Sequence, residues 1–278
     1  CLGCMGFGEP ERGREKWSIG EAESRDVIKK ALDSGINFFD TANLYSAGSS
    51  EEIVGKALKD FANRDEIVLA SKLYFPMFDG PNAKGLSRKS IFAEIDHSLK
   101  RLQTDYLDLY IIHRWDYGTP IEETMEALHD LVKMGKVRYI GASSMHAWQF
   151  AKAQFIAEKN GWTKFVSMQN LYNLLYREEE REMIPLLQDQ NVAMTPWSPL
   201  AGGRLTRDIG AITARASQAV QADLPAYIVA SDNEVISRVH KLADERGITR
   251  GQVATAWMLS KDYVTAPLIG ATKWIGYT

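Results

Sequence analysis

Short apolar segments alternate with longer segments of helical periodicity along almost the whole of this 278-residue chain. The short segments are β-branched or apolar, and they predict strands at 1–7, 36–40, 66–72, 106–112, 137–142, 164–169, 192–197 and 263–269. The longer segments carry apolar residues at helical spacing, and they predict helices at 22–34, 49–61, 90–102, 121–134, 147–159, 178–190, 232–247 and 250–259. Strands that alternate with helices in this way build a parallel sheet.

Eight such units predict a (β/α)8 barrel, and no Pro- or Ser-rich linker divides residues 1–278, so we expect a single domain. The predicted strands are apolar on both faces, which is typical of parallel strands buried on both sides. An open, doubly wound sheet is the alternative. Such a sheet usually carries a G-x-G-x-x-G loop after its first strand, but the glycines at 3, 6 and 8 are spaced differently. Segment 201–231 is predicted to be a loop over the barrel top.

The composition excludes several classes of protein. The chain has 33 Lys and Arg against 36 Asp and Glu, and this formal charge of −3 excludes a strongly basic nucleic-acid-binding domain. No apolar run is long enough to cross a membrane. The two cysteines, Cys1 and Cys4, are too few for a disulfide framework, which predicts a reducing, cytoplasmic setting. The histidines on predicted helices lack metal-ligand spacing, so we expect no metal site.

Both ends of the sequence are abrupt. The chain begins within a predicted strand and without Met, and only five residues follow Lys273. We therefore expect that N-terminal residues and part of a C-terminal tail are missing from the sequence.

Reactive side chains follow three consecutive predicted strands at the end where barrel enzymes carry their active sites. Asp40 ends the second strand, Lys72 ends the third and His113 ends the fourth, while Tyr45 follows in the loop after Asp40. Because side chains alternate along a strand, each of the three strand-end residues continues an apolar column that points to one face. We expect the four groups to converge at one rim of the barrel.

The chemistry of these groups suggests a proton relay. A buried Asp and Lys must pair or remain unfavourably desolvated. A lysine cation beside Tyr45 favours phenolate, so we expect it to lower the tyrosine pKa and make the phenol a better acid-base group. His113 can orient a carbonyl oxygen or share the proton. A proton donor aimed at a carbonyl implies reduction, and reduction needs a source of hydride.

Each of these residues also has an ordinary structural interpretation. An aspartate after a strand often caps a turn, and a lone lysine often extends to the surface. Asp108 shows that a charged residue on a strand need not belong to an active site, because it is predicted in mid-strand on the face opposite to His113. We interpret Asp108 as a structural carboxylate with an unidentified partner. The four reactive groups at the strand ends and in the loop are harder to explain as separate structural residues, because they occur together at three consecutive strands.

Seven motifs resemble those of the aldo-keto reductases and occur in the same order. They are Phe39-Asp40-Thr41-Ala42 with Tyr45, Ala70-Ser71-Lys72, Ile111-Ile112-His113, Gly141-Ala142-Ser143, Met168-Gln169-Asn170, Trp197-Ser198-Pro199-Leu200-Ala201 with Gly203, and Ile269-Gly270-Ala271-Thr272-Lys273. The resemblance covers residues 1 to about 273 and looks closest to bacterial oxidoreductases of unassigned substrate. It implies a (β/α)8 barrel, bound NADPH or NADP⁺, and reversible reduction of aldehydes or ketones to alcohols.

The resemblance also implies individual roles. It gives a catalytic tetrad of Asp40, Tyr45, Lys72 and His113. The implied cofactor contacts are Gly3, Cys4, Met5, Asp40, Ser143, Ser144, Gln169, Trp197, Ser198, Leu200, Gly202, Arg204, Gly270, Thr272 and Lys273. Of these, Ser143 and Gln169 correspond to partners of the nicotinamide carboxamide, and Trp197 to the aromatic ring that stacks on it. Lys273 corresponds to a ligand of the adenosine 2′-phosphate, which favours NADPH over NADH.

Two tryptophans are candidates for the substrate pocket. Trp115 lies two residues after His113, and Trp17 lies in the first loop after a strand. The principal hypothesis is an NADP-dependent aldo-keto reductase that acts on small-molecule carbonyls, with Tyr45 as proton donor. A cofactor-binding regulatory subunit with little turnover is one alternative, and a barrel hydrolase or isomerase that uses Asp40 and His113 is another. The physiological substrate, oligomeric state and protein partners are not predicted.

Overall fold

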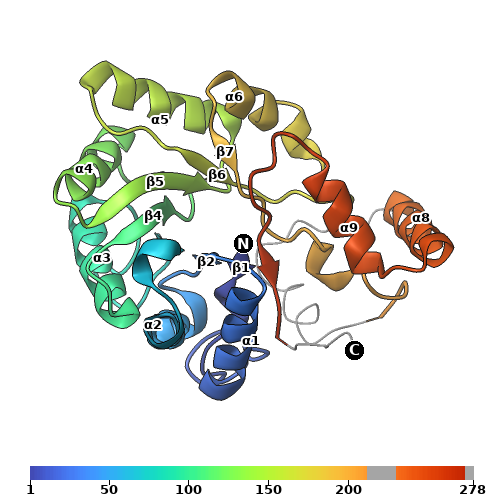
Figure 1. Cartoon of the computed structure of the whole chain (residues 1–278). Coiled ribbons are helices and arrows are strands. Elements are labelled where there is room, and N and C mark those ends of the chain that lie inside the picture. The colour runs from blue at the N-terminus through green and yellow to red at the C-terminus, as the bar shows by residue number, and fades with distance from the viewer. Residues whose placement is uncertain (212–229, 273–278) are drawn as a thin grey trace. The chain divides into compact units, whose positions relative to one another are not determined.

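The computed structural model describes residues 1–211 and 230–272 (Figure 1). The chain divides into two compact units. The first contains Cys1–Met168 and resumes at Gly270, and the second contains Gln169–Ile269. Both boundaries fall inside strands, β6 (Ser167–Gln169) and β8 (Ile269–Gly270).

The first unit alternates strands and helices as the sequence predicts. Its strands are β1 (Leu2–Gly3), β2 (Phe38–Asp40), β3 (Val68–Leu73), β4 (Leu107–Ile112) and β5 (Val137–Ser143). Its α-helices are α1 (Glu21–Asp33), α2 (Ser49–Phe61), α3 (Arg88–Leu102), α4 (Ile121–Lys133) and α5 (Ala147–Asn160). Short 3-10 turns, η1 (Cys4–Gly6), η2 (Tyr45–Gly48) and η3 (Arg64–Glu66), stand between them. Figure 1 shows α3 and α4 outside strands β4 and β5.

The second unit contains shorter elements. They are η4 (Glu178–Glu180), α6 (Met183–Asp189), β7 (Ala193–Met194), η5 (Ala201–Gly203), α8 (Ala230–Arg246) and α9 (Arg250–Leu259). Its apolar core includes Leu205 and the helix residues Ile236, Val239, Val253 and Ala254. The predicted loop at 201–231 therefore includes a short 3-10 turn, and its part from 212 to 229 lies outside the described residues.

The strands pair in the order β7-β6-β5-β4-β3-β2-β1-β8, and β1 to β5 are parallel. Sequence neighbours are therefore sheet neighbours, as the repeated βα scheme predicts, and this is the strand order of a (β/α)8 barrel. Ala70, Leu109 and Ile111 form a buried apolar cluster with Phe38 packed against it. This cluster confirms the predicted strand parity, since these residues lie on the same faces as the strand-end groups.

A short sequence signal correctly gives the end of α1, whereas another gives the wrong start for α2. The glycine that directly follows the predicted helix 22–34 indicates a left-handed helix end, and this is confirmed: Gly35 has a φ of 81°, and Ile36 N donates to Ala31 O at 2.9 Å. A capping box led by Ser49 would fit the start of α2, but the N-cap is Gly48 with a φ of 89°. Ser49 lies inside the helix, and its hydroxyl donates to Ser46 O at 2.8 Å.

The two terminal strands are much shorter than predicted. The segment expected at 1–7 is a strand only at Leu2–Gly3 before the 3-10 turn η1 begins. The segment expected at 263–269 is a strand only at its end, although Val264 bridges Met194 of β7. Apolar composition therefore predicts the position of these strands but overestimates their extent.

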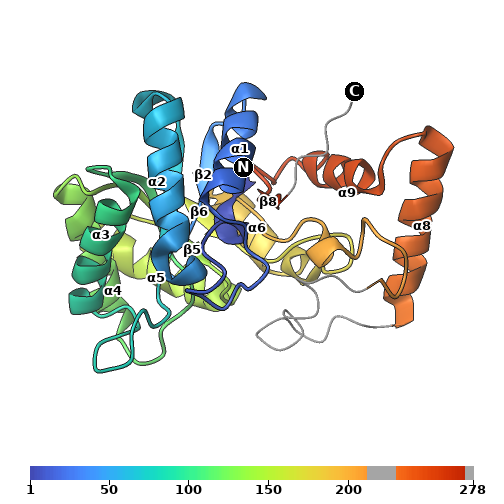
Figure 2. The same ribbon diagram turned by 90° about the horizontal axis from the view of Figure 1, so that it is seen from below.

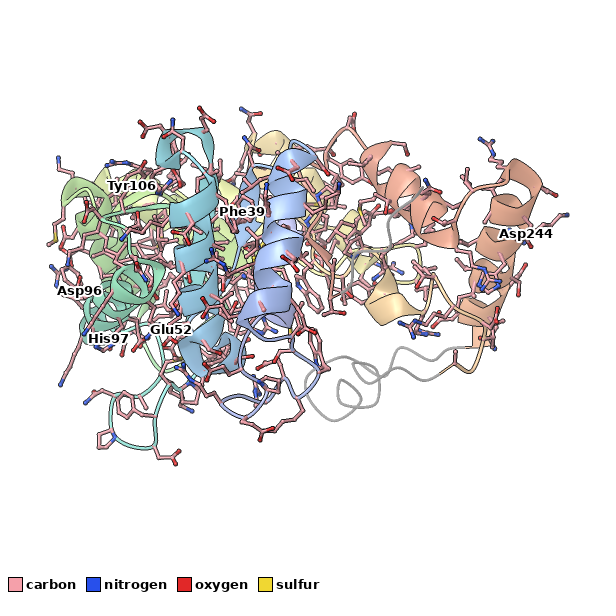
Figure 3. The ribbon with its side chains drawn as sticks, turned by 60° about the horizontal axis from the view of Figure 1, so that its bottom comes forward. Phe39, Glu52, Asp96, His97, Tyr106 and Asp244 are labelled. Atoms are coloured by element: carbon pink, nitrogen blue, oxygen red, sulfur yellow. The ribbon has the colours of Figure 1, made fainter. Side chains whose placement is uncertain are left out.

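Helices α1 and α2 lie side by side in both Figure 1 and Figure 2. Phe39 of β2 is fully buried, and Figure 3 places it in the region between them. Its neighbour Asp40 lies on the opposite face of the strand. Within the part of the chain that the structure describes, no helix has both the length and the apolar character needed to span a membrane.

Asp108 has a structural partner. Its carboxylate lies 2.7 Å from Arg64 Nη1 and accepts a hydrogen bond from Leu69 N at 2.8 Å. The Arg64 guanidinium also stacks over Tyr106, with Cζ 4.0 Å from the ring centroid. Figure 3 shows Tyr106 and Glu52, at the start of α2, towards opposite ends of that helix. This supports the interpretation of Asp108 as a structural residue, away from the end that carries Tyr45.

Candidate active site

Lys72 is the centre of a buried polar cluster at the end of β3. Its side chain is fully buried, and Asp40, which is 1% exposed, pairs with its ammonium group. The ammonium also donates to Thr41 O at 2.7 Å and to the Tyr45 hydroxyl at 3.2 Å. A buried ammonium ion is tolerable here because all these acceptors surround it.

Tyr45 stands at the start of η2, directly ahead of a left-handed turn. Ser46, Ala47 and Gly48 have φ values of 45°, 50° and 89°. For the two residues other than glycine, this conformation costs roughly 1–3 kcal/mol each. The turn therefore needs support from the rest of the fold, and its geometry determines where the phenol of Tyr45 points.

His113 follows β4 and completes the cluster. Its ring centroid lies 5.9 Å from that of Tyr45, and the two planes meet at 80°. The Phe75 ring also packs edge-on against the His113 ring, with centroids 5.1 Å apart. Among the described residues, the buried His113 Nδ1 has no hydrogen-bond partner. The structure thus brings together all four residues of the predicted tetrad.

Burial and charge set the protonation states. Burial raises the pKa of Tyr45 above its usual value, and the opposing effect of the Lys72 cation is smaller. The expectation of a lowered Tyr45 pKa is therefore wrong for the protein alone, because desolvation of the phenolate outweighs the lysine charge. Burial also lowers the pKa of His113 well below its usual value, and the cations of Lys72 and Arg114 act in the same direction. Burial alone would lower the pKa of Lys72, but Asp40 and Tyr45 raise it overall.

These directions describe a neutral phenol, a neutral imidazole and an ammonium cation at neutral pH. A neutral phenol can donate a proton, and the adjacent cation stabilises the phenolate that remains. The neutral imidazole can hold a carbonyl oxygen by a hydrogen bond without competing as an acid.

The first unit holds part of the predicted cofactor set. Gly3 and Met5 are partly exposed, whereas Cys4 is fully buried and its thiol donates to Leu2 O at 3.5 Å. Ser143 is buried at the end of β5, and its hydroxyl lies 3.1 Å from that of Ser144. Residues Gly270 and Thr272 also belong to this unit, and Lys273 lies outside the described residues.

Cys1 and Cys4 have C-x-x-C spacing, and neither is in a disulfide. Burial raises the pKa of the Cys4 thiol, which is opposite to the shift that makes a cysteine reactive. Among the described residues there is no group of three or more His, Cys, Asp or Glu suited to hold a metal ion.

The second unit holds the rest of the predicted cofactor set. Gln169 is buried at the end of β6, and Trp197 is partly exposed after β7. Ser198 has a φ of 57°, and its hydroxyl accepts from Gly202 N at 3.2 Å. Leu200 lies in the same loop and packs on the core of this unit. Arg204 Nη1 pairs with Asp232 of α8 at 2.9 Å, which orients its guanidinium group.

Both candidate substrate residues lie in the first unit. The Trp17 ring packs against Gly6, where an added Cβ would lie 3.1 Å from its Cζ3 atom. Trp115 packs on Trp148 of α5, with ring centroids 6.0 Å apart. Trp17 is therefore placed at the end of β1, the same end of the sheet as the tetrad.

Sequence reasoning missed the residues that support the tetrad. Thr41 contributes a backbone carbonyl, which no side-chain pattern can reveal. Ser50 donates to Cys4 O at 2.9 Å and lies 2.9 Å from the Thr41 hydroxyl. In the sequence, Ser50 is only one more small residue in a predicted helix, so nothing marks it as buried. Glu15 binds the turn after Tyr45 from a distant loop, and no local signal marks it.

Comparison with known proteins identifies the family. The model of the aldo/keto reductase family matches residues 1–274. Versiconal hemiacetal acetate reductase of Aspergillus parasiticus is 47% identical over 93% of this chain and 81% of its own length. An aldo-keto reductase of Alternaria alternata is 45% identical over 98% of this chain and 80% of its own length. Another from Metarhizium robertsii is 42% identical over 91% of this chain and 75% of its own length.

These relatives are fungal, so the expected closeness to bacterial members is not supported. The family match and these identities cover nearly the whole chain. They agree with the strand order and the motifs described above. This protein is a member of the aldo/keto reductase family of oxidoreductases.

Proposed function

We propose that this protein reduces an aldehyde or ketone to an alcohol with NADPH, and that Tyr45 donates the proton. The observation that carries the proposal is the hydrogen bond from the buried Lys72 ammonium to the Tyr45 hydroxyl, beside the Asp40 carboxylate. A tyrosine in this setting is held for acid-base chemistry rather than for packing alone.

Each member of the tetrad has a distinct task. The carbonyl oxygen of the substrate sits between the Tyr45 hydroxyl and the His113 ring. Tyr45 gives its proton to this oxygen as negative charge develops there. Lys72 stabilises the resulting phenolate, and Asp40 keeps Lys72 charged and oriented.

The donor set fits a nicotinamide dinucleotide. In the first unit, the Ser143 hydroxyl can hydrogen-bond a carboxamide. In the second unit, the Gln169 amide has the same capacity and Trp197 offers a flat ring for stacking, and it is the family resemblance that assigns these groups to one nicotinamide. Arg204 can fork onto a phosphate. Because the thiol of Cys4 is buried, we expect Gly3 and Met5 to make the predicted contacts near the ribose. When bound, the reduced nicotinamide supplies the hydride.

The nucleotide preference depends on Lys273, and this assignment rests on the family resemblance. Changing Lys273 to Ala should raise the dissociation constant for NADPH by about tenfold and leave that for NADH nearly unchanged, because only NADPH carries the 2′-phosphate. Fluorescence titration with each nucleotide measures both constants. An equal loss of affinity for the two would contradict the 2′-phosphate role.

The pH dependence of the reaction should show that neither Tyr45 nor His113 titrates near neutral pH. The raised pKa of Tyr45 keeps the phenol protonated until well above neutral pH, and the lowered pKa of His113 keeps the imidazole neutral into the acidic range. We expect kcat/KM for reduction to be flat from about pH 6.5 to about pH 10, the ordinary values for these groups. It should fall only above that range, as the proton donor is lost. A fall centred near neutral pH would contradict these protonation states.

The substrate class is tested by following oxidation of the reduced nicotinamide with a panel of aldehydes and ketones. The Aspergillus parasiticus relative is named for a hemiacetal acetate, which is a masked carbonyl compound, so hemiacetals belong in the panel. Turnover with NADPH and a carbonyl supports the enzyme. Tight nucleotide binding without turnover on any member would favour a regulatory, cofactor-loaded subunit.

Two further proposals come from the sequence. Residues 1–278 are proposed to form a single (β/α)8 barrel domain, although they divide into two compact units. We also propose a cytoplasmic, reducing location, which is supported by the two cysteines, Cys1 and Cys4, neither of which is in a disulfide.

A further inference from the structure

The left-handed turn after Tyr45 is held by a buried carboxylate from another loop. Glu15 lies between β1 and α1, and only 5% of it is exposed. Its Oε2 atom accepts a hydrogen bond from Ser46 N at 3.0 Å. Ser46 is itself fully buried and follows Tyr45 directly. A hydrogen bond to a carboxylate is among the stronger ones in proteins, so it can offset the unfavourable backbone conformation.

Glycines in the same loop allow this close approach. A Cβ added at Gly8 would overlap the Ser46 side chain, and one added at Gly13 would overlap Ser46 Cα. The same added Cβ at Gly13 would also lie 3.0 Å from Glu15 Oε2. The loop between β1 and α1 is therefore shaped to press its backbone against the turn and to place one carboxylate on it.

A second contact reinforces the first. Arg12 Nη2 donates to Ala47 O at 3.2 Å, and the same guanidinium pairs with Glu52 in two hydrogen bonds of 2.7 and 3.0 Å. Figure 3 shows Glu52 at the end of α2 that adjoins this loop. The loop thus binds both the N–H of Ser46 and the carbonyl of Ala47. Trp17, two residues after Glu15, packs on Gly6 in the same loop.

We propose that Glu15 is a positioning residue for Tyr45, fixing the strained turn so that the phenol stays on Lys72 and faces the carbonyl. This inference rests on the proposed function. Without the carboxylate, Ser46 N loses its buried acceptor and the turn can relax towards ordinary backbone angles. The Tyr45 hydroxyl would then leave its position, and an error of about 1 Å in a catalytic group costs up to about 100-fold in rate.

The main test uses Glu15→Ala with the exposed Glu11→Ala of the same loop as the matched control. We expect Glu15→Ala to lower kcat for aldehyde reduction about 10- to 100-fold, with the dissociation constant for NADPH nearly unchanged. Glu11→Ala should behave like the wild type. Unchanged kcat in Glu15→Ala would overturn the proposal.

Two conservative variants separate the effect of the Glu15 side-chain length from the effect of its charge. Glu15→Gln keeps an oxygen that can accept from Ser46 N, so it should retain most of the activity. Glu15→Asp keeps the charge but is one methylene shorter, so it should lose activity even if Glu15→Ala does not fold. If Glu15→Gln and Glu15→Asp are both as active as the wild type, the carboxylate does not hold the turn.

A double-mutant cycle distinguishes positioning from general stability. In the Tyr45→Phe background, Glu15→Ala should change the residual rate by less than about twofold, because the group that it positions is gone. An equal fold-loss in both backgrounds would show that Glu15 does not act through Tyr45. The proposed function fails separately if Tyr45→Phe itself reduces aldehydes at the wild-type rate.

Discussion

Replacing Tyr45 with Phe should lower kcat for aldehyde reduction about 100- to 10,000-fold. The change removes only the hydroxyl that Lys72 contacts at 3.2 Å, and the ring can keep its edge contact with His113. Loss of a proton donor at the reacting oxygen affects the transition state rather than binding. The dissociation constant for NADPH should therefore stay within about twofold of the wild type.

The matched control is another tyrosine of the same unit. Tyr117 is 78% exposed, and its hydroxyl accepts from Gln149 Nε2 at 2.9 Å, so Tyr117→Phe should keep full activity. Stopped-flow measurement of nicotinamide oxidation gives the rate of the chemical step for both variants. Equal single-turnover rates for wild type and Tyr45→Phe would remove Tyr45 from the mechanism.

Replacing Lys72 with Met should abolish reduction and also destabilise the fold. The substitution has similar length but leaves the Asp40 carboxylate, which is 1% exposed, without its cation. Removing one partner of a buried ion pair costs about 3–5 kcal/mol in the free energy of unfolding. Denaturant titration monitored by tryptophan fluorescence measures this loss.

The double variant Asp40→Asn with Lys72→Met tests the cause of the instability. It removes both charges, so it should recover much of the free energy of unfolding but none of the activity. Lys56→Met is the control, because Lys56 pairs with Glu21 on the surface and should contribute at most about 1 kcal/mol. If Lys72→Met is as stable as Lys56→Met, the buried pair does not have the role given to it here.

Patterns of local origin predicted much of the fold. The alternation of strands and helices gave the barrel, and strand parity correctly placed Ala70, Leu109 and Ile111 on one buried face. Gly35 correctly marked a helix end, because the left-handed conformation there depends on the residue itself. The same parity argument predicts from the sequence alone that Asp40, Lys72 and His113 lie at one rim of the barrel.

Features that depend on long-range packing were not predicted. Ser49 with Glu52 has the spacing of a capping box, but the left-handed Gly48 and the contact of Ser49 with Ser46 O give the helix another start. The direction of the Tyr45 pKa shift depends on how deeply the phenol is buried, which its neighbours in sequence do not reveal. Glu15 acts across 31 residues of sequence, so only the folded chain reveals it.

Tyr45, Lys72, Asp40 and His113 form one acid-base cluster, and we propose that it lies beside the nicotinamide when the cofactor is bound. The most direct test of this proposal is a crystal structure with NADP⁺ and an unreactive carbonyl analogue of a substrate identified in the panel. We predict that the analogue's oxygen lies within hydrogen-bonding distance of both the Tyr45 hydroxyl and the His113 ring, with the nicotinamide against its carbonyl carbon. A nucleotide bound away from Tyr45, or a Tyr45 hydroxyl far from Lys72 Nζ, would contradict the account.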